Sequence, residues 1–144
     1  MSTITKGIEF TVPAIPVAQP RQRSVAVAGR IRTYTPTKHP VNDFKASARL
    51  SAAQAWSGAP LDGPLSVAIA FVLPRPKAKI RKRGDNPRYW HTGRPDFDNL
   101  AKSLTDALTG LLWRDDSQLA MVAITKQVAA ADEQPCVVVK VEPL

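Results

Sequence analysis

The chain contains little cysteine and histidine and has no long hydrophobic run. Of its 144 residues, one is cysteine and two are histidine, which excludes a disulfide framework and a thiolate metal site within one chain. The longest apolar run covers residues 67–73 and is far too short to cross a bilayer. The first ten residues contain no apolar stretch of signal-peptide length. We therefore expect a soluble, cytosolic protein that does not contact a membrane.

Acidic residues are also in the minority, and the positive charge is concentrated in two segments. The chain has 20 lysines and arginines against 12 acidic residues, a net charge of +8. Residues 20–49 hold seven basic residues against one aspartate, and residues 74–94 hold eight against one. A basic face that only keeps the protein soluble is one interpretation. Two such segments together with a concentrated acidic region favour binding to a polyanion such as nucleic acid.

A length of 144 residues predicts a single domain over residues 1–144, long enough to bury a core. Two segments, 17–39 and 74–95, have loop composition, with a small hairpin around residues 28–30 in the first. We expect a mixed α/β (α+β) fold in which a mixed sheet of about four strands packs against two or more helices. The expected strands cover residues 8–12, 65–73, 118–128 and 136–141, and the expected helices cover residues 40–55, capped by Gly58, and 99–109, capped by Asp98 and Gly110.

Four aspartates surround the second predicted helix, in the run GRPDFDNLAKSLTDALTGLLWRDDSQ over residues 93–118. In an extended backbone, Asp96 and Asp98 would point the same way and Phe97 the opposite way, into the core. Lys102 follows Asp98 by four residues and so shares its helix face. Carboxylates gathered together repel one another unless a cation lies between them. Hard oxygen ligands without a cysteine or histidine cluster suit Mg²⁺ or Mn²⁺.

Each part of this pattern also has an ordinary structural interpretation. Asp98 alone could be a helix N-cap, and Asp98 with Lys102 an ordinary surface pair. Asp115 and Asp116 alone could form a polar turn before a strand. The functional hypothesis depends on the conjunction, and residues 115–116 can return towards 96–98 only through the arrangement of the sheet, which the spacing does not prove.

The run Arg94-Pro95-Asp96-Phe97-Asp98-Asn99-Leu100, with Lys102, residues 106–110 (DALTG) and residues 115–118 (DDSQ), resembles the signature of the RusA family of Holliday-junction resolvases. The close match covers about 25 residues, whereas residues 1–60 match only by basic character. The resemblance implies a homodimeric, metal-dependent endonuclease of bacteria or their phages, active in DNA recombination and repair. It also implies a bacterial cytosolic or nucleoid location.

Carried over residue by residue, the resemblance implies that Asp96, Asp98 and Asp116 are catalytic carboxylates that bind the metal. Lys102 matches the catalytic lysine of the family. Asp106 and Asp115 are further acidic positions of the motif, and we favour Asp116 over Asp115 as the ligand. Mg²⁺ is the expected cofactor, with Mn²⁺ as a substitute.

The expected substrate is a four-way DNA junction, whose twofold symmetry fits a homodimer with two active sites. The basic residues are assigned as a group to DNA contacts: Arg21, Arg23, Arg30, Arg32, Lys79, Arg81, Lys82, Arg83 and Arg94. Tyr89, Trp90 and His91 could contact DNA or anchor their loop. A metal-dependent nuclease of other branched DNA and a non-catalytic nucleic-acid-binding protein are the alternatives.

Overall fold

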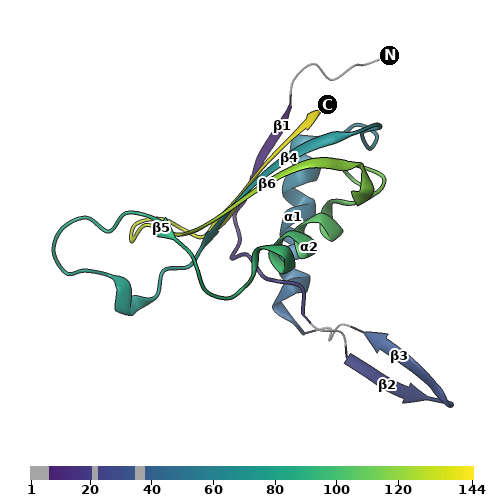
Figure 1. Ribbon diagram of the computed structural model, residues 1–144, viewed down its shortest axis with the longest axis horizontal. Helices are drawn as coiled ribbons and strands as arrows, with labels where there is room; N and C mark the ends of the chain where they lie inside the picture. Colours follow the sequence, from purple (N-terminus) through teal and green to yellow (C-terminus); the bar gives the residue numbers. More distant parts are fainter. Residues whose placement is uncertain (1–6, 21–22, 35–37) are drawn as a thin grey trace.

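The computed structural model describes residues 7–20, 23–34 and 38–144. A five-stranded sheet forms the centre of the protein (Figure 1). Neighbouring strands are antiparallel except for one parallel pair, β4 and β6. The sequence indicated about four strands, and the fifth is the two-residue β5 at the edge. Across the sheet the strands are β1 (Ile8–Val12), β7 (Cys136–Pro143), β4 (Leu65–Leu73), β6 (Leu119–Val128) and β5 (Tyr89–Trp90).

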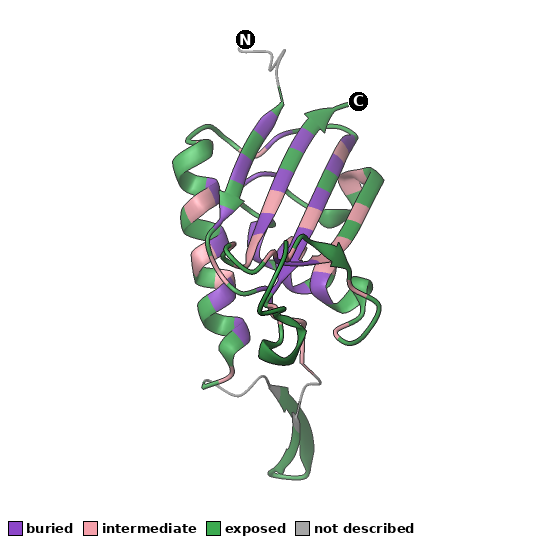
Figure 2. Cartoon of the chain, turned by 90° about the vertical axis from the view of Figure 1, so that its left-hand side faces the viewer, coloured by how far each residue is buried: buried purple, intermediate pink, exposed green. Residues whose placement is uncertain are grey.

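Two helices, α1 (Pro40–Ala55) and α2 (Phe97–Leu108), pack against the same face of this sheet. Buried and exposed residues alternate along the strands (Figure 2). In β1, and in β4 from Leu65 to Phe71, the buried set is the period-two series expected when one sheet face carries the core. The fold is therefore the mixed α+β domain that the hydrophobic pattern predicted, with its core between one sheet face and the helices.

Helix α1 begins where the sequence predicted and ends without the expected glycine cap. His39 is the N-cap, and its Nδ1 accepts a hydrogen bond from the Val41 N–H at 3.1 Å. Trp56, not Gly58, is the C-cap. The last turn closes by a Trp56 N–H bond to the Ala52 carbonyl, so the helix does not need a left-handed residue at its end.

A hairpin of β2 (Arg23–Val27) and β3 (Arg30–Tyr34) projects away from the domain (Figure 1). Its two-residue turn has positive φ at Ala28 (51°) and Gly29 (75°), the combination that joins strands with the natural twist. The predicted hairpin is therefore confirmed, and Gly29 meets a conformational requirement that few other residues meet.

The segment of residues 74–88, which we call the arm, extends from the sheet on the side away from the hairpin (Figure 1). It contains a short 3₁₀ helix, η1 (Lys77–Lys79), and leads into β5. The arm therefore has more structure than its loop composition suggested. In the part of the chain that the structure describes, no helix is both long enough and apolar enough to span a membrane.

Candidate active site

Asp96 and Asp98 lie at the N-terminal end of α2. Asp96 is the N-cap, with an extended backbone (φ −73°, ψ 152°), and its side chain makes no capping hydrogen bond. Asp98 lies in the first helical turn, and both residues are exposed. No ion pair involves either carboxylate among the described residues. The free N–H groups and dipole of this helix end favour negative charge here.

Two expectations about this end of α2 are wrong. Asp98 is not the N-cap, because the helix begins at Phe97. Phe97 does not point into the core and is 59% exposed. Successive helical residues are about 100° apart, so residues 97 and 98 do not have the opposed directions of a strand. The buried stripe of α2 starts only at Leu100.

The backbone before Asp96 is tied to the end of β6 by Lys126. This half-buried lysine pairs with buried Phe71 of β4, so it lies on the helix side of the sheet. Its Nζ donates to the Gly93 carbonyl at 3.0 Å and to the Pro95 carbonyl at 2.9 Å. We call residues 91–95 the strap. Lys126 therefore holds the strap that leads into Asp96.

His91 begins the strap and is placed by the same strand. Its backbone N–H donates to the Lys126 carbonyl at 3.1 Å. Burial, and then the charge of Lys126, lower the pKa of His91, against a smaller upward effect of a hydrogen bond with the Arg94 backbone. A neutral imidazole at neutral pH adds no second positive charge beside Lys126.

Lys102 and Asp106 continue the exposed face of α2. They follow Asp98 at intervals of four residues, so the three side chains line one side of the helix. All three are exposed, and the described residues show no ion pair between them. Lys102 is thus a cation one turn from Asp98, as the sequence predicted.

Asp115 and Asp116 lie beyond the other end of α2, in a tightly bonded turn. Asp115 is the N-cap of the short 3₁₀ helix η2 (Asp116–Gln118), and its Oδ1 accepts from the Ser117 N–H at 2.9 Å. The Gln118 Oε1 accepts from the Asp115 N–H at 3.0 Å, completing a capping box. Hydrogen bonds from the Ser117 backbone and side chain, and then one with Asp116, lower the pKa of Asp115.

Within one chain the two aspartate pairs do not come together. Lys126, beside the strap, is opposite Phe71, whereas Leu119, just after η2, is opposite Leu65. Six residues of β4 separate these positions, a distance of roughly 20 Å. Over residues 7–20, 23–34 and 38–144, no group of three or more acidic, histidine or cysteine side chains is close enough to hold a metal ion. The metal assignment of Asp96, Asp98 and Asp116 stays a prediction.

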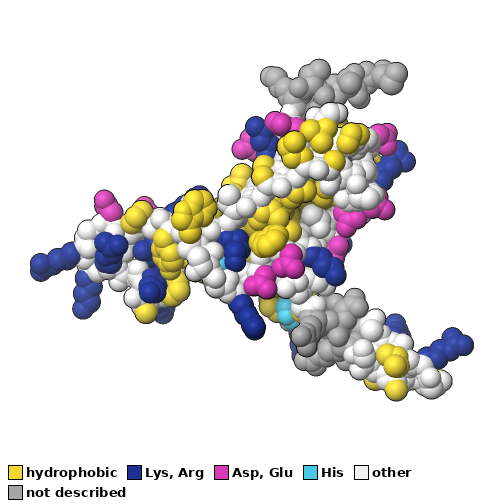
Figure 3. Space-filling model, viewed as in Figure 1, with side chains coloured by type: hydrophobic (Ala, Val, Ile, Leu, Met, Phe, Trp, Pro, Cys, Tyr) yellow, Lys and Arg dark blue, Asp and Glu magenta, His cyan; other side chains and the backbone are white. Residues whose placement is uncertain are grey.

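The basic residues assigned to DNA lie mainly on the two projecting parts of the molecule. Lysines and arginines are gathered on the arm and are present on the hairpin (Figure 3). Arg94 is separate from both and lines an open depression together with Pro95, Asp96 and Asn99. Arg21 lies outside the described residues, and of Arg23 the structure describes only the backbone. Arg30 and Arg32 of the hairpin and Lys79, Arg81, Lys82 and Arg83 of the arm are all exposed.

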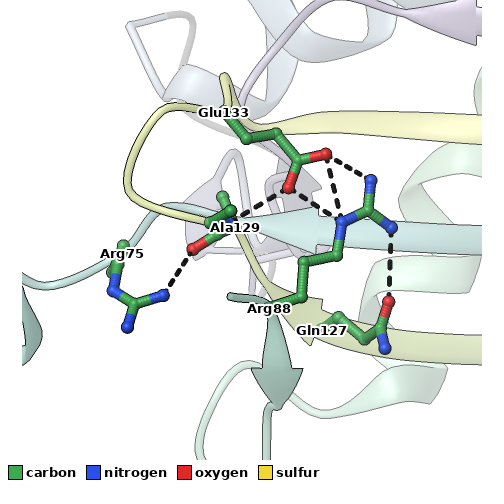
Figure 4. Close-up of polar contacts among 6 residues, drawn as sticks. Arg75, Arg88, Gln127, Ala129 and Glu133 are labelled. Atoms are coloured by element: carbon green, nitrogen blue, oxygen red, sulfur yellow. Dashed lines mark hydrogen bonds and ion pairs between the residues drawn. The ribbon is translucent and has the colours of Figure 1, made fainter. Parts of the chain in front are cut away.

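Two residues that hold the strap and the arm in place, Lys126 and Arg88, are not among the predicted site residues. Lys126 had a visible signal, because residues 122, 124, 126 and 128 are Val, Ile, Lys and Val, which places a lysine in the inward series of a strand. Arg88 had none. It forms an ion pair with Glu133 of the β6–β7 turn, and its Nη1 donates to the Gln127 Oε1 at 3.3 Å (Figure 4).

A comparison with protein families gives one match across almost the whole chain. A family described as "Endodeoxyribonuclease RusA" matches residues 13–142. The chain belongs to the RusA family. Among curated proteins, it is 32% identical over 124 residues to "Uncharacterized protein YqaN" of Bacillus subtilis (strain 168), covering 83% of this chain and 86% of that protein. It is 29% identical over 119 residues to "Crossover junction endodeoxyribonuclease rusA" of Lactococcus phage r1t, covering 82% and 85%.

Membership of the RusA family confirms the resemblance inferred from the acidic motif and extends it over the basic N-terminal part. It makes the chain an endodeoxyribonuclease, a hydrolase that acts on DNA. Asp96, Asp98, Lys102 and the later aspartates all lie inside the matched region.

Proposed function

We propose that this RusA-family enzyme resolves four-way DNA junctions by paired, divalent-metal-dependent hydrolysis of phosphodiester bonds during recombination and repair. The family match over residues 13–142 carries the proposal. The name of the phage relative, a crossover junction endodeoxyribonuclease, supports the substrate. The exposed basic arm and hairpin supply the positive surface that a DNA backbone requires.

The donor groups at the N-terminal end of α2 fit a hard divalent cation. Asp96 and Asp98 present exposed carboxylates, and Asp96 is not used as a side-chain cap. Oxygen ligands of this kind suit Mg²⁺, with Mn²⁺ as a substitute. A bound Mg²⁺ would lower the pKa of a water and neutralise charge on the phosphate. Lys102 would stabilise the negative charge that develops on the scissile phosphate.

Asp116 is the better candidate than Asp115 for the third carboxylate. The Asp115 oxygen already accepts the Ser117 N–H, and its backbone N–H is bonded to Gln118. Recruiting the Asp115 carboxylate to a metal would disrupt this capping box, whereas Asp116 helps to close the turn through its backbone carbonyl, which accepts from the Leu119 N–H.

A homodimer is part of the proposal. Paired incisions in a twofold-symmetric junction need two active sites. The separation of the aspartate pairs gives a second reason. The described residues of one chain bring no three acidic side chains close enough to hold a metal, so a metal site with all three carboxylates needs Asp116 from another copy. We therefore propose that Asp96 and Asp98 of one protomer share a metal with Asp116 of its partner.

Mixed dimers test this arrangement. Asp98→Asn and Asp116→Asn are each expected to be inactive as homodimers. If the sites are shared, a heterodimer of the two variants has one site with both changes and one intact site, so single nicks return after mixing and re-equilibration. If each site lies within one protomer, both sites of the heterodimer are defective and activity does not return.

The function itself is tested with a labelled synthetic four-way junction and a linear duplex, in Mg²⁺ or in EDTA. The expected result is a pair of symmetric, metal-dependent nicks in the junction alone. Equal cleavage of flaps and junctions would indicate a nuclease of branched DNA in general. Tight binding without cleavage in both Mg²⁺ and Mn²⁺ would leave a DNA-binding protein and overturn the proposal.

A further inference from the structure

The arm contains an open pocket that neither the acidic motif nor the family match assigns. Its volume is about 410 Å³, which is within the range of small-molecule sites. The pocket lies near the sheet end of the arm, next to the start of β5. The residues that matter for its chemistry are Arg75, Lys79, Ile80, Arg81, Pro87 and Tyr89.

Arg75 fixes the frame of this pocket. Its Nη1 donates to the carbonyls of Pro87 at 2.7 Å and Ala129 at 3.2 Å, and its Nε donates to the Lys79 carbonyl at 3.1 Å. The bond to Ala129 anchors the arm to the end of β6 (Figure 4). The guanidinium also lies 5.2 Å from the centre of the Tyr89 ring, a cation–π distance. One side chain therefore holds both walls and the aromatic ring.

Asn86 closes the distal part of the arm. Its Oδ1 accepts from the Arg81 N–H at 2.7 Å, and its Nδ2 donates to the Arg81 carbonyl at 3.2 Å. The outgoing and returning segments of the arm are thereby joined by Arg75 near the sheet and by Asn86 further out. A pocket with walls fixed in this way loses little conformational entropy when a ligand enters.

The lining combines apolar surface with unpaired positive charge. Ile80 is 46% exposed and Tyr89 is 36% exposed, so both present apolar area to a ligand. Arg88 is neutralised by Glu133. The side chains of Lys79 and Arg81, by contrast, have no hydrogen bond or ion pair within the described ranges. The complementary ligand has a flat, partly apolar ring and an anionic group, which is the chemistry of a nucleotide.

We propose that this pocket binds one unpaired nucleotide of a DNA strand, with its base against Tyr89 and Ile80 and its phosphate beside Lys79 and Arg81. The proposal rests on the proposed function, since it takes DNA as the ligand of the arm. The adjacent Lys82 and Arg83 continue the positive surface along a strand, which favours DNA over a small free anion. Such a pocket would stabilise a junction whose bases are opened at the crossover.

The test uses single-stranded DNA and needs no cleavage. Fluorescein-labelled eight-residue thymidine oligonucleotide and an abasic oligonucleotide of equal length are titrated with the full-length protein, and anisotropy is measured in EDTA. Ile80→Ser is the main variant, because Ile80 is exposed and makes none of the frame's hydrogen bonds. Ile15→Ser is the matched control, since Ile15 is 55% exposed and lies outside the arm.

We expect Ile80→Ser to weaken binding of the thymidine oligonucleotide by about tenfold, in keeping with the loss of one base contact. The same variant should bind the abasic oligonucleotide like the wild type, and Ile15→Ser should bind both normally. Tyr89→Ala should reproduce the Ile80→Ser result, and Tyr89→Phe should retain binding because the ring remains.

Two results would overturn the pocket assignment. One is wild-type affinity of both Ile80→Ser and Tyr89→Ala for the thymidine oligonucleotide. The other is an equal loss for the abasic oligonucleotide, which would show that no base is bound. Junction cleavage with normal oligonucleotide binding by the variants would refute the pocket alone. Base-dependent binding without junction cleavage would refute the proposed function alone.

Discussion

The two ends of α2 carry the same kind of side chain in opposite settings. At the N-terminal end, Asp96 caps the helix by its backbone position only, and its carboxylate makes no capping bond. At the other end, the Asp115 carboxylate accepts the Ser117 N–H and belongs to a capping box. Aspartates of one motif therefore have two different roles. The Asp96 carboxylate is available to bind a ligand, whereas the Asp115 carboxylate stabilises a turn.

The largest effect on cleavage should come from a substitution at the N-terminal end of α2. Asp98→Asn should lower junction cleavage by at least about a hundredfold, because it removes a charged ligand from the proposed metal site. Binding to the junction in EDTA should be unchanged. Single-turnover cleavage and gel-shift titration measure the two effects. Asp132→Asn, an exposed aspartate of the β6–β7 turn, is the control, and normal cleavage by Asp98→Asn would refute the site assignment.

Beyond the other end of α2, the roles of Asp115 and Asp116 can be distinguished by their effects on cleavage and on stability. Asp116→Asn should abolish cleavage with an unchanged melting temperature. Asp115→Ala should retain measurable cleavage and lower the melting temperature by a few degrees, because it removes a cap. Parallel cleavage assays and thermal scans make the comparison. The opposite pattern would make Asp115 the metal ligand and Asp116 the residue that stabilises the turn.

A smaller effect on cleavage is expected from Lys126, which anchors the strap before Asp96. Lys126→Met frees the Gly93 and Pro95 carbonyls, so the strap before Asp96 loses its anchor. We expect cleavage to fall about ten- to a hundredfold, as for residues that orient metal ligands, with junction affinity in EDTA unchanged. Hydrogen exchange should also become faster in residues 91–96.

Lys126→Arg should restore part of the activity, because a guanidinium can donate to the same carbonyls. Lys140→Met is the charge-matched control, since Lys140 is an exposed lysine on β7. A loss of junction affinity as large as the loss of cleavage would instead identify Lys126 as a phosphate contact.

The smallest effect concerns the ion pair that joins the arm to the β6–β7 turn. A hydrogen bond from Arg88 is the main cause of the lowered pKa of Glu133. A carboxyl group whose pKa is lower in the folded state stabilises the folded protein at pH values above its unfolded-state pKa. This stabilisation is lost as the pH falls through the folded-state pKa. Glu133→Gln should therefore cost no more than about 1 kcal/mol at neutral pH. The melting temperatures of variant and wild type should converge in acid, and a constant difference down to pH 3 would contradict this.

Much of the fold could be predicted from local patterns. The period-two burial of β1 and β4 and the stripe of Leu100, Leu104 and Leu108 are properties of strands and helices that each need one buried face. The turn at Ala28-Gly29 was also predictable, because its backbone requirement is local. The start of α2 was not predictable. The helix begins at Phe97, two residues earlier than expected, and this shift changes the backbone of Asp98 from extended to helical.

The candidate site was predictable in its residues and unpredictable in its arrangement. The spacing of Asp98, Lys102 and Asp106 determines that they share a helix face. No local rule determines the distance from Asp98 to Asp116, because it depends on α2 and β6 running in opposite directions across the sheet. Likewise, Arg75 contacts the Ala129 carbonyl from 54 residues away, and no short-range pattern predicts such a bond.

The sequence by itself determined which residues are chemically capable: four aspartates, a lysine in register with them, and two concentrated basic segments. These depend on residue type and on spacing within single elements. The tertiary structure alone decided that the aspartate pairs form no metal-binding group within the described residues of one chain, that Lys126 anchors the strap, and that Arg75 shapes the arm's pocket. Those facts depend on how strands far apart in the chain pair in the sheet, and this pairing is set by burial of the whole core rather than by any local run of residues.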